Sequence, residues 1–99
     1  MIIKGKTALD PNREFVKVVV DIEKEILSAN CELHIDCADE LMKNGSRGSD
    51  LWGANIHLKE QRIDFVSMIN IKPPKYTSMK IQDQSIKDKI EALIKKLIF

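Results

Sequence analysis

The sequence lacks any apolar run long enough to cross a membrane, because charged residues interrupt its hydrophobic stretches. A transmembrane helix needs about 20 consecutive apolar residues. The first residues, Met1–Gly5, also lack the long apolar core of a secretory signal peptide. We therefore expect a cytoplasmic protein that has no membrane partner.

No charge of one sign predominates. The 99 residues include 16 Lys and Arg against 15 Asp and Glu, which leaves a net charge of +1. This balance excludes a global field that would draw nucleic acid or an anionic membrane. Only a local basic patch could contact nucleic acid, and acidic residues dilute it, so the sequence does not favour this partner. The patch would contain Lys72, Lys75, Tyr76, Lys80, Lys87 and Lys89.

Cysteine is equally scarce. Cys31 and Cys37 are the two cysteines of the chain, and their spacing of six residues matches no zinc-binding or redox signature. In a reducing compartment two such cysteines are expected to be free thiols. The sequence assigns no metal and indicates no cofactor.

The chain is rich in segments that alternate apolar and polar residues. Alternation with period two sends the polar side chains of a strand to one face of a sheet. The segments therefore predict one hydrophilic face and one buried face. The polar positions are Asp21, Glu23, Glu25, Glu32, His34, Asp36, Asn55, His57, Asp64, Asn70 and Lys72. A chain of 99 residues has room for one core, so we expect a single domain over residues 1–99.

The first alternating stretch, Val16–Leu27, predicts a strand because its valine-rich start is β-branched. A helix over residues 16–29 is the alternative. Ser28–Cys31 predicts a turn, and Glu32–Asp36 predicts a returning strand. The two strands would pair with matching faces.

A short helix is expected over Cys37–Lys43, with Asp36 as its cap and Asn44-Gly45 as its end.

Two shorter elements are predicted before Val16. Residues 1–6 predict a short strand, and Asp10-Pro11 predicts the start of a helical turn that ends near residue 14.

A second hairpin is predicted from strands Leu51–Leu58 and Ile63–Lys72, joined by the polar turn Lys59–Arg62. Trp52 is expected to anchor the core. A stiff, extended link over Lys72–Lys75 would end the second strand. The predicted facing pairs are Leu58 with Ile63, Ile56 with Phe65, Trp52 with Ile69, and His57 with Asp64.

The C-terminal segment has the spacing of an amphipathic helix that begins with a capping box of Ser85 and Asp88. Its apolar positions are Ile86, Ile90, Leu93, Ile94, Leu97 and Ile98. The predicted fold is therefore α+β. It contains a mainly antiparallel sheet of four or five strands built from two hairpins, a short middle helix, and the C-terminal helix packed on the apolar face.

Several strings stand in a distinctive order and spacing: Val18–Glu23, Glu32–Asp36, Gly45-Ser46, Leu51–Asn55, Ser67–Pro73 and Ile81–Asp83. Together they resemble a small family of uncharacterised bacterial and archaeal proteins, catalogued as a domain of unknown function. The resemblance covers about Val16 to the C-terminus, and it implies no known activity, substrate or cofactor. The family pattern has arginine where this chain has Lys72, and lysine cannot form the same bidentate fork.

His34 and Asp36 lie two residues apart on a predicted strand, so their side chains would share one face. Glu23 or Glu25 on the neighbouring strand would supply a third group. Such a cluster suits acid–base catalysis or a metal site with nitrogen and oxygen ligands. The structural alternative is that Asp36 caps the helix and that His34 pairs with Glu25 across the strands.

Other residues are candidates for binding. Ser46 and Arg47 lie in the loop Gly45–Ser49, which could form a backbone nest for an anion or be a plain connection. Trp52 would mark an interface if it were exposed. Asn55 and Asn70 could bind a ligand or form hydrogen bonds with the backbone at strand ends. Lys72 is the last of the predicted binding residues.

The sequence therefore favours a small cytoplasmic binding or assembly module without catalysis of its own, with formation of a homo-oligomer left open. The alternative is a small hydrolase-like enzyme that uses His34, Asp36 and Glu23. Geometry separates the two, because catalysis requires these side chains to converge in a concave pocket.

Overall fold

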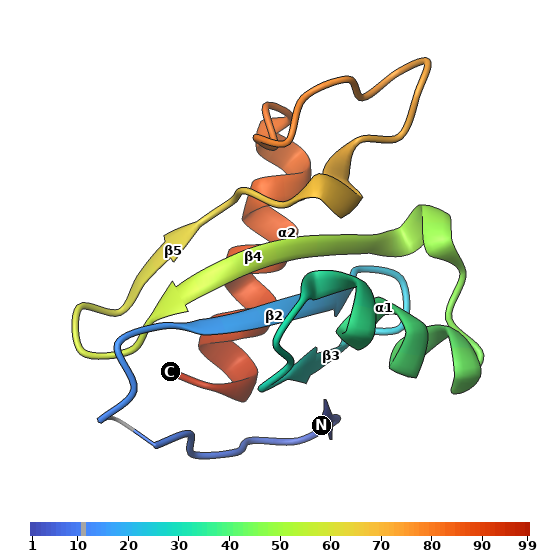
Figure 1. Ribbon diagram of the computed structural model, residues 1–99. Helices are drawn as coiled ribbons and strands as arrows, with labels where there is room; N and C mark the ends of the chain where they lie inside the picture. The colour runs from blue at the N-terminus through green and yellow to red at the C-terminus, as the bar shows by residue number, and fades with distance from the viewer. Residues whose placement is uncertain (11) are drawn as a thin grey trace.

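The computed structural model describes residues 1–10 and 12–99, and it contains a five-stranded antiparallel sheet with helices on both faces (Figure 1). The strands lie in the order β1-β3-β2-β4-β5. They are β1 (Ile2–Ile3), β2 (Val16–Asp21), β3 (Ile26–Ala29), β4 (Leu51–His57) and β5 (Arg62–Asp64). The other elements are α1 (His34–Lys43), η1 (Gly48–Asp50), η2 (Met68–Asn70) and α2 (Gln84–Leu97). The predicted α+β class, with its C-terminal helix, is confirmed.

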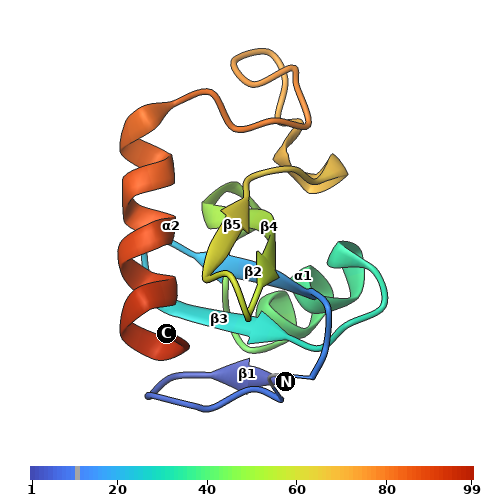
Figure 2. The same ribbon diagram turned by 90° about the vertical axis from the view of Figure 1, so that its left-hand side faces the viewer.

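Helix α2 covers the face of the sheet that the alternation predicts to be apolar (Figure 2). Val20 and Ile56 are fully buried there, and Trp52 is 3% exposed, so the expectation that Trp52 anchors the core is confirmed. The helical residues in this core are Ile86, Ile90, Leu93, Ile94, Leu97 and Ile98. Within residues 1–10 and 12–99, no helix is long and apolar enough to span a bilayer.

The opposite face is not the open hydrophilic surface that the alternation predicts, because α1 packs on it (Figure 2). A second apolar cluster joins Val19 and Leu51 of the sheet to Cys37, Ala38 and Leu41 of α1. The central strands are therefore buried on both faces, and the polar groups on this side are either buried or confined to its margins.

The first hairpin turns earlier than predicted. Strand β2 ends at Asp21, and β3 begins at Ile26, so the predicted continuous strand Val16–Leu27 and the turn at Ser28–Cys31 are wrong. The reason is local, since the Asp21 carboxylate accepts hydrogen bonds from the backbone N–H groups of Glu23 and Lys24. A short acidic side chain that bonds the backbone two residues ahead favours a turn over a strand.

The predicted strand Glu32–Asp36 is also wrong, because α1 begins at His34. Leu33 occupies the N-cap position without a side-chain hydrogen bond, and Asp36 lies in the first turn instead of capping it. Leu33 and Ile35 are 56% and 48% exposed. Their alternation therefore does not reflect burial in a sheet. The predicted end of this helix at Asn44 is confirmed.

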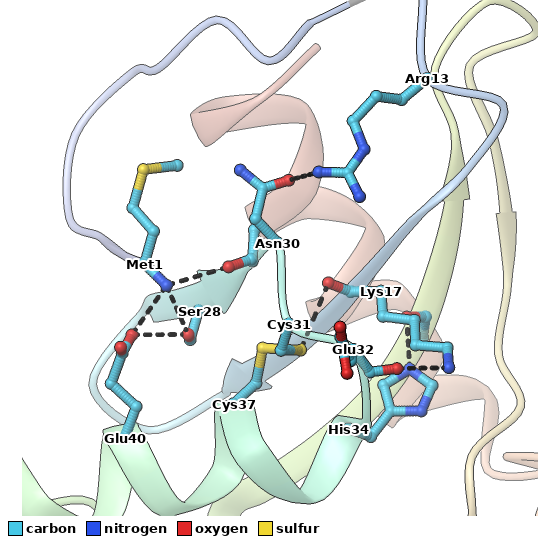
Figure 3. Close-up of a disulfide and its surroundings, with 12 residues drawn as sticks. Met1, Arg13, Lys17, Ser28, Asn30, Cys31, Glu32, His34, Cys37 and Glu40 are labelled. Atoms are coloured by element: carbon cyan, nitrogen blue, oxygen red, sulfur yellow. Dashed lines mark hydrogen bonds and ion pairs between the residues drawn. A yellow bond between two sulfur atoms is a disulfide. The ribbon is translucent and has the colours of Figure 1, made fainter.

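Cys31 and Cys37 form a disulfide, so the prediction of free thiols is wrong (Figure 3). Cys31 lies in the segment that leaves β3, and Cys37 lies in α1. A spacing of six residues matches no familiar signature, but the close approach of this segment to the helix brings the sulfur atoms together. That approach is a tertiary feature that cysteine spacing does not reveal.

The second hairpin forms with its register shifted by two residues. Ile63 pairs with Ile56 instead of the predicted Leu58, and each side chain keeps its predicted face because the shift is even. The turn therefore comprises Leu58–Gln61. His57 and Asp64 remain in contact, because His57 Nε2 lies 2.8 Å from Asp64 Oδ2.

Strand β5 is shorter than predicted. It ends at Asp64, and the chain turns through η2 where the continuation to Lys72 was expected, so the predicted pairing of Trp52 with Ile69 is wrong. The extended link over Lys72–Lys75 is wrong as well, because Lys72 and Tyr76 exchange backbone hydrogen bonds across a turn.

The elements near the two ends of the chain differ from the predicted ones by a few residues. Within the first six residues, β1 covers Ile2–Ile3. Pro11, in the predicted helical turn, lies outside the described residues. Helix α2 begins one residue before the expected Ser85 cap, and its N-cap is Asp83, whose carboxylate accepts from the backbone N–H groups of Ser85 and Ile86.

Asp21 is the polar group on which the β2–β3 turn depends. We expect Asp21→Ala to lower the free energy of unfolding by about 2–4 kcal/mol, because two backbone donors of the turn and the buried Ser46 hydroxyl lose their acceptor. Urea denaturation measures this loss. Asp39→Ala is the matched control, since Asp39 is exposed on α1 and its loss should change stability by less than about 0.5 kcal/mol. Equal effects of the two substitutions would contradict the assignment.

Candidate functional site

A groove of about 410 Å³ lies between the start of α1 and the η2 turn. It is the concave surface on which exposed apolar side chains gather, since Leu33, Ile35 and Met68 line it and Met68 is 76% exposed. The complete lining is Lys17, Leu33, His34, Ile35, Ser67, Met68 and Ile69. Exposed large apolar side chains around a hollow are typical of a binding surface.

The floor of the groove is built on the backbone of β4. A Cβ atom placed on Gly53 would lie 2.5 Å from Ser67 Cβ and 3.2 Å from His34 Cδ2. Only a residue without a side chain therefore lets η2 and the start of α1 approach β4 together. Glycine within a strand often marks such a close approach.

Asn70 fixes η2 against the same strand. Its Oδ1 accepts from Gly53 N at 2.8 Å, and its Nδ2 donates to Gly53 O at 3.0 Å. The side-chain amide thus satisfies the backbone groups of Gly53 where β5 has already ended. Because Asn70 is 1% exposed, its predicted role in bonding the backbone is confirmed, and no polar atom of its amide faces the groove opening.

His34 joins α1 to the sheet. Its Nε2 donates a hydrogen bond to the Ala54 carbonyl at 2.9 Å, so in the neutral ring Nδ1 carries no proton and can accept. Burial lowers the pKa of His34 below its ordinary value. The hydrogen bond to Ala54 opposes this lowering, the positive charge of Lys17 adds to it, and the Asn55 side chain opposes it. The ring therefore stays neutral at physiological pH.

Lys17 contributes the charged group of the groove. This residue lies on β2, and its Nζ donates to the Glu32 carbonyl at 2.6 Å, which leaves further ammonium protons for a ligand (Figure 3). Ser67 is 4% exposed and accepts from Ile69 N at its Oγ, and among the described residues its hydroxyl donates no hydrogen bond. The groove thus offers an ammonium group, a hydroxyl group and an imidazole acceptor beside an apolar wall.

The three predicted catalytic residues do not converge. Asp36 is exposed on α1 and does not line the groove, whereas Glu23 lies in the β2–β3 turn and lines a separate pocket against α2 with Lys89 and Lys96. His34 alone lies in the groove. Among residues 1–10 and 12–99, no three His, Cys, Asp or Glu side chains gather closely enough to hold a metal ion.

The loop residues Ser46 and Arg47 face different surroundings. Ser46 is 8% exposed, and its Oγ donates to Asp21 Oδ2 at 2.6 Å, so this hydroxyl supports the β2–β3 turn. Arg47 is exposed at the N-cap of η1.

Trp52 and Lys72 come together away from the groove. Lys72 Nζ lies 5.0 Å from the centroid of the Trp52 ring and donates to the carbonyls of Gly48 and Ile69. Burial lowers the pKa of Lys72, and the charge of Asp50 opposes the lowering. These contacts engage the Lys72 ammonium within the protein itself.

Asn55 lies on β4 outside the groove lining, and it lines a separate pocket with Asp64 and Phe65. It faces Lys17 across the β2–β4 pair, and its Oδ1 is buried without a hydrogen-bond partner in the described part of the chain. A buried amide oxygen without a donor is uncommon in folded proteins. Of the predicted binding residues, Asn55 and Trp52 therefore each have a buried polar atom without a partner in the described part of the chain.

Most of the apolar wall was missed from the sequence. Leu33 and Ile35 were assigned to the buried face of a strand, and Met68 to the polar face of another. A helical signal was present, because Cys37, Ala38 and Leu41 have the spacing of a buried helical stripe and place Ile35 beside it. No comparable pattern in the sequence indicates that η2 lies close to β4.

The low pKa of His34 has a consequence for stability. The unfolded chain binds a proton near pH 6.5 and the folded chain only at lower pH, so this residue stabilises the fold above about pH 6.5 and loses that contribution on acidification. His34→Gln keeps an N–H donor but does not titrate. We expect the difference in unfolding free energy between wild type and this variant to shrink as the pH falls from about 7 to 5, as measured by urea denaturation. A difference that does not vary with pH contradicts the assignment.

The close contact at Gly53 can be tested directly. We expect Gly53→Ala to destabilise the protein by about 1–3 kcal/mol, because the new methyl group overlaps Ser67. Gly5→Ala is the matched control, since an added Cβ at Gly5 meets no atom within 4 Å. Thermal and urea denaturation measure both. If Ser67→Gly fails to restore stability to the Gly53→Ala variant, another contact is responsible.

The chain matches no curated protein and no solved structure. The sequence pattern of the family described as "Protein of unknown function (DUF5674)" matches residues 4–97. The predicted resemblance to a domain of unknown function is thus confirmed, and the chain belongs to the DUF5674 family.

Proposed function

We propose that this protein is a small binding module whose groove at the start of α1 takes an organic anion with an aliphatic or aromatic body. The observation that carries the proposal is the exposed apolar wall of Leu33, Ile35 and Met68 around a hollow of about 410 Å³. Pockets for small ligands commonly have volumes of about 300–1,000 Å³ and few polar groups.

The polar groups of the groove favour an anion as the ligand's head. Lys17 brings the positive charge, and Ser67 adds a hydroxyl donor within the same lining. A carboxylate or sulfonate would accept from both, while the body of the ligand covers the apolar wall. Burying one such side chain contributes about 1.5–3 kcal/mol, so the apolar contacts supply most of the affinity.

The hydrolase-like alternative has less support. Catalysis by His34 would need a partner group, and Asp36 and Glu23 lie outside the groove. The ring nitrogen Nε2 is also engaged by Ala54. Binding needs no such convergence, because neutral His34 can serve as an acceptor at the groove floor.

Three further expectations belong to this proposal. The module would act in the cytoplasm. Nucleic acid stays a disfavoured partner, because the negative charge of Asp83 lies near Lys75 in the basic patch. A homo-oligomer would use the same exposed apolar wall, so its formation competes with ligand binding.

The test uses anilinonaphthalene sulfonate, a fluorescent probe with an aromatic body and an anionic group. We expect saturable fluorescence enhancement and chemical-shift changes at Lys17, Ser67 and Met68. Met68→Ser should weaken binding by about tenfold, because the side chain covers the ligand and its loss removes about 1.5 kcal/mol. Lys17→Gln should weaken binding and reduce its dependence on salt.

The matched control is Met79→Ser. Met79 is 45% exposed and lies outside the groove, so its substitution should leave probe affinity unchanged. Equal loss in the two methionine variants indicates non-specific adsorption and contradicts the proposal. Sedimentation supplies a second check. If wild-type protein is a dimer and Met68→Ser is a monomer that binds no probe, the occupant of the groove is a second copy of the chain.

A further inference from the structure

The disulfide encloses the wall of the groove. Cys31 and Cys37 are bonded (Figure 3), and Leu33, His34 and Ile35 are three of the five residues between them. Three of the groove residues therefore belong to one small covalent loop. Their position depends on whether that loop is closed.

The start of α1 has little else to hold it. Leu33 at the N-cap makes no side-chain hydrogen bond, although a Ser, Asp, Asn or Thr at this position would satisfy a free backbone donor. Among the described residues, two hydrogen bonds tie the loop to the sheet, one from Lys17 to the Glu32 carbonyl and one from His34 to the Ala54 carbonyl. Each is a single contact to a segment that is otherwise exposed.

The two cysteines differ in exposure. Cys31 is half-buried, whereas Cys37 is 1% exposed and packs with Ala38 and Leu41 in the second apolar cluster. An external thiolate can therefore reach Cys31 more easily than Cys37. Cys37 lies in the first turns of α1, where free backbone N–H groups stabilise a departing thiolate.

We propose that the Cys31–Cys37 disulfide is a thiol–disulfide exchange site that controls the groove, and the ligand part of this inference rests on the proposed function. The thiolate of a dithiol reductant attacks Cys31 Sγ, the bond to Cys37 breaks, and Cys37 leaves as a thiolate that takes up a proton. The second thiol of the reductant then attacks the mixed disulfide, which frees Cys31 and leaves the reductant as a disulfide. Two electrons pass to the protein, and two thiols result.

The reduced form can keep the rest of the fold. The Lys17 carbonyl lies 3.8 Å from Cys31 Sγ, so a free thiol there has an acceptor. Cys37 stays among apolar side chains, which suit a neutral thiol. Reduction therefore loosens the loop and the first turn of α1, and the later turns remain packed on the sheet. In a reducing compartment such disulfides are commonly transient and regulatory.

The first experiment compares oxidised wild-type protein with protein in dithiothreitol by amide hydrogen exchange. We expect exchange of the Asp36, Cys37 and Ala38 amides to rise by about tenfold or more on reduction, because the first turn opens locally. The Leu41 and Val19 amides should keep their protection, since Leu41 lies in the later turns of α1 and Val19 lies in the central strand β2. Unchanged exchange at the first turn overturns the inference.

The second experiment tests the order of attack with single variants. Cys37→Ser leaves Cys31 as the free thiol, and Cys31→Ser leaves Cys37. We expect Cys31 to react with dithiobis-nitrobenzoate about tenfold or more faster than Cys37, because it is more exposed. Equal rates, or faster reaction of Cys37, contradict the assigned roles.

The third experiment measures probe affinity in the two redox states. Anilinonaphthalene sulfonate should bind the reduced protein about tenfold more weakly, and the double variant Cys31→Ala, Cys37→Ala should not respond to dithiothreitol. Equal affinity in both states overturns control of the groove. If neither state binds the probe, the proposed function fails, and the exchange experiment alone decides whether the disulfide controls the wall.

Discussion

The close approach of η2 and the start of α1 to the bare backbone of Gly53 is the contact on which the groove depends. Without a side chain at this position, Ser67 and His34 reach β4, and Asn70 bonds the backbone where the next strand has ended. The polar atoms of the strand are thus satisfied by side chains from η2. The Asn70 amide thus bonds Gly53 where a neighbouring strand would otherwise do so, and η2 partly encloses this face of the sheet.

The region around the groove has an uncapped helix start and exposed apolar side chains, and both features are typical of binding sites. The first turn of α1 has no side-chain cap, and Met68 and Leu33 are exposed apolar residues on either side of the hollow. Such segments belong to the less stable part of a fold, from which binding sites are commonly drawn. A disulfide joins the segment after β3 to this end of the helix. One short loop therefore contains both the disulfide and three residues of the groove lining.

Several elements could be predicted because their signals are local and repeated. The valines of β2 and the alternation of β4 identify the buried face, and the apolar stripe of α2 identifies the helix that covers it. The predicted register of the second hairpin is wrong by two residues, but every side chain still lies on its predicted face. An alternation of period two indicates the face of each side chain and does not distinguish registers that differ by two. The first hairpin was predicted less well, because the hydrogen bonds of Asp21 end β2 before its alternation ends.

The sequence by itself determined the α+β class, the buried face of the central strands and the amphipathic C-terminal helix, since each follows from the periodicity of neighbouring residues. Only the tertiary structure decided the site. His34 and Asp36 alternate as in a strand but lie on a helix, and the groove joins residues of β2, α1 and η2 that are distant in the chain. The pairing of Cys31 with Cys37 likewise depends on where the segment after β3 meets α1. Contacts between segments are set by packing, and no local pattern of side chains encodes that geometry.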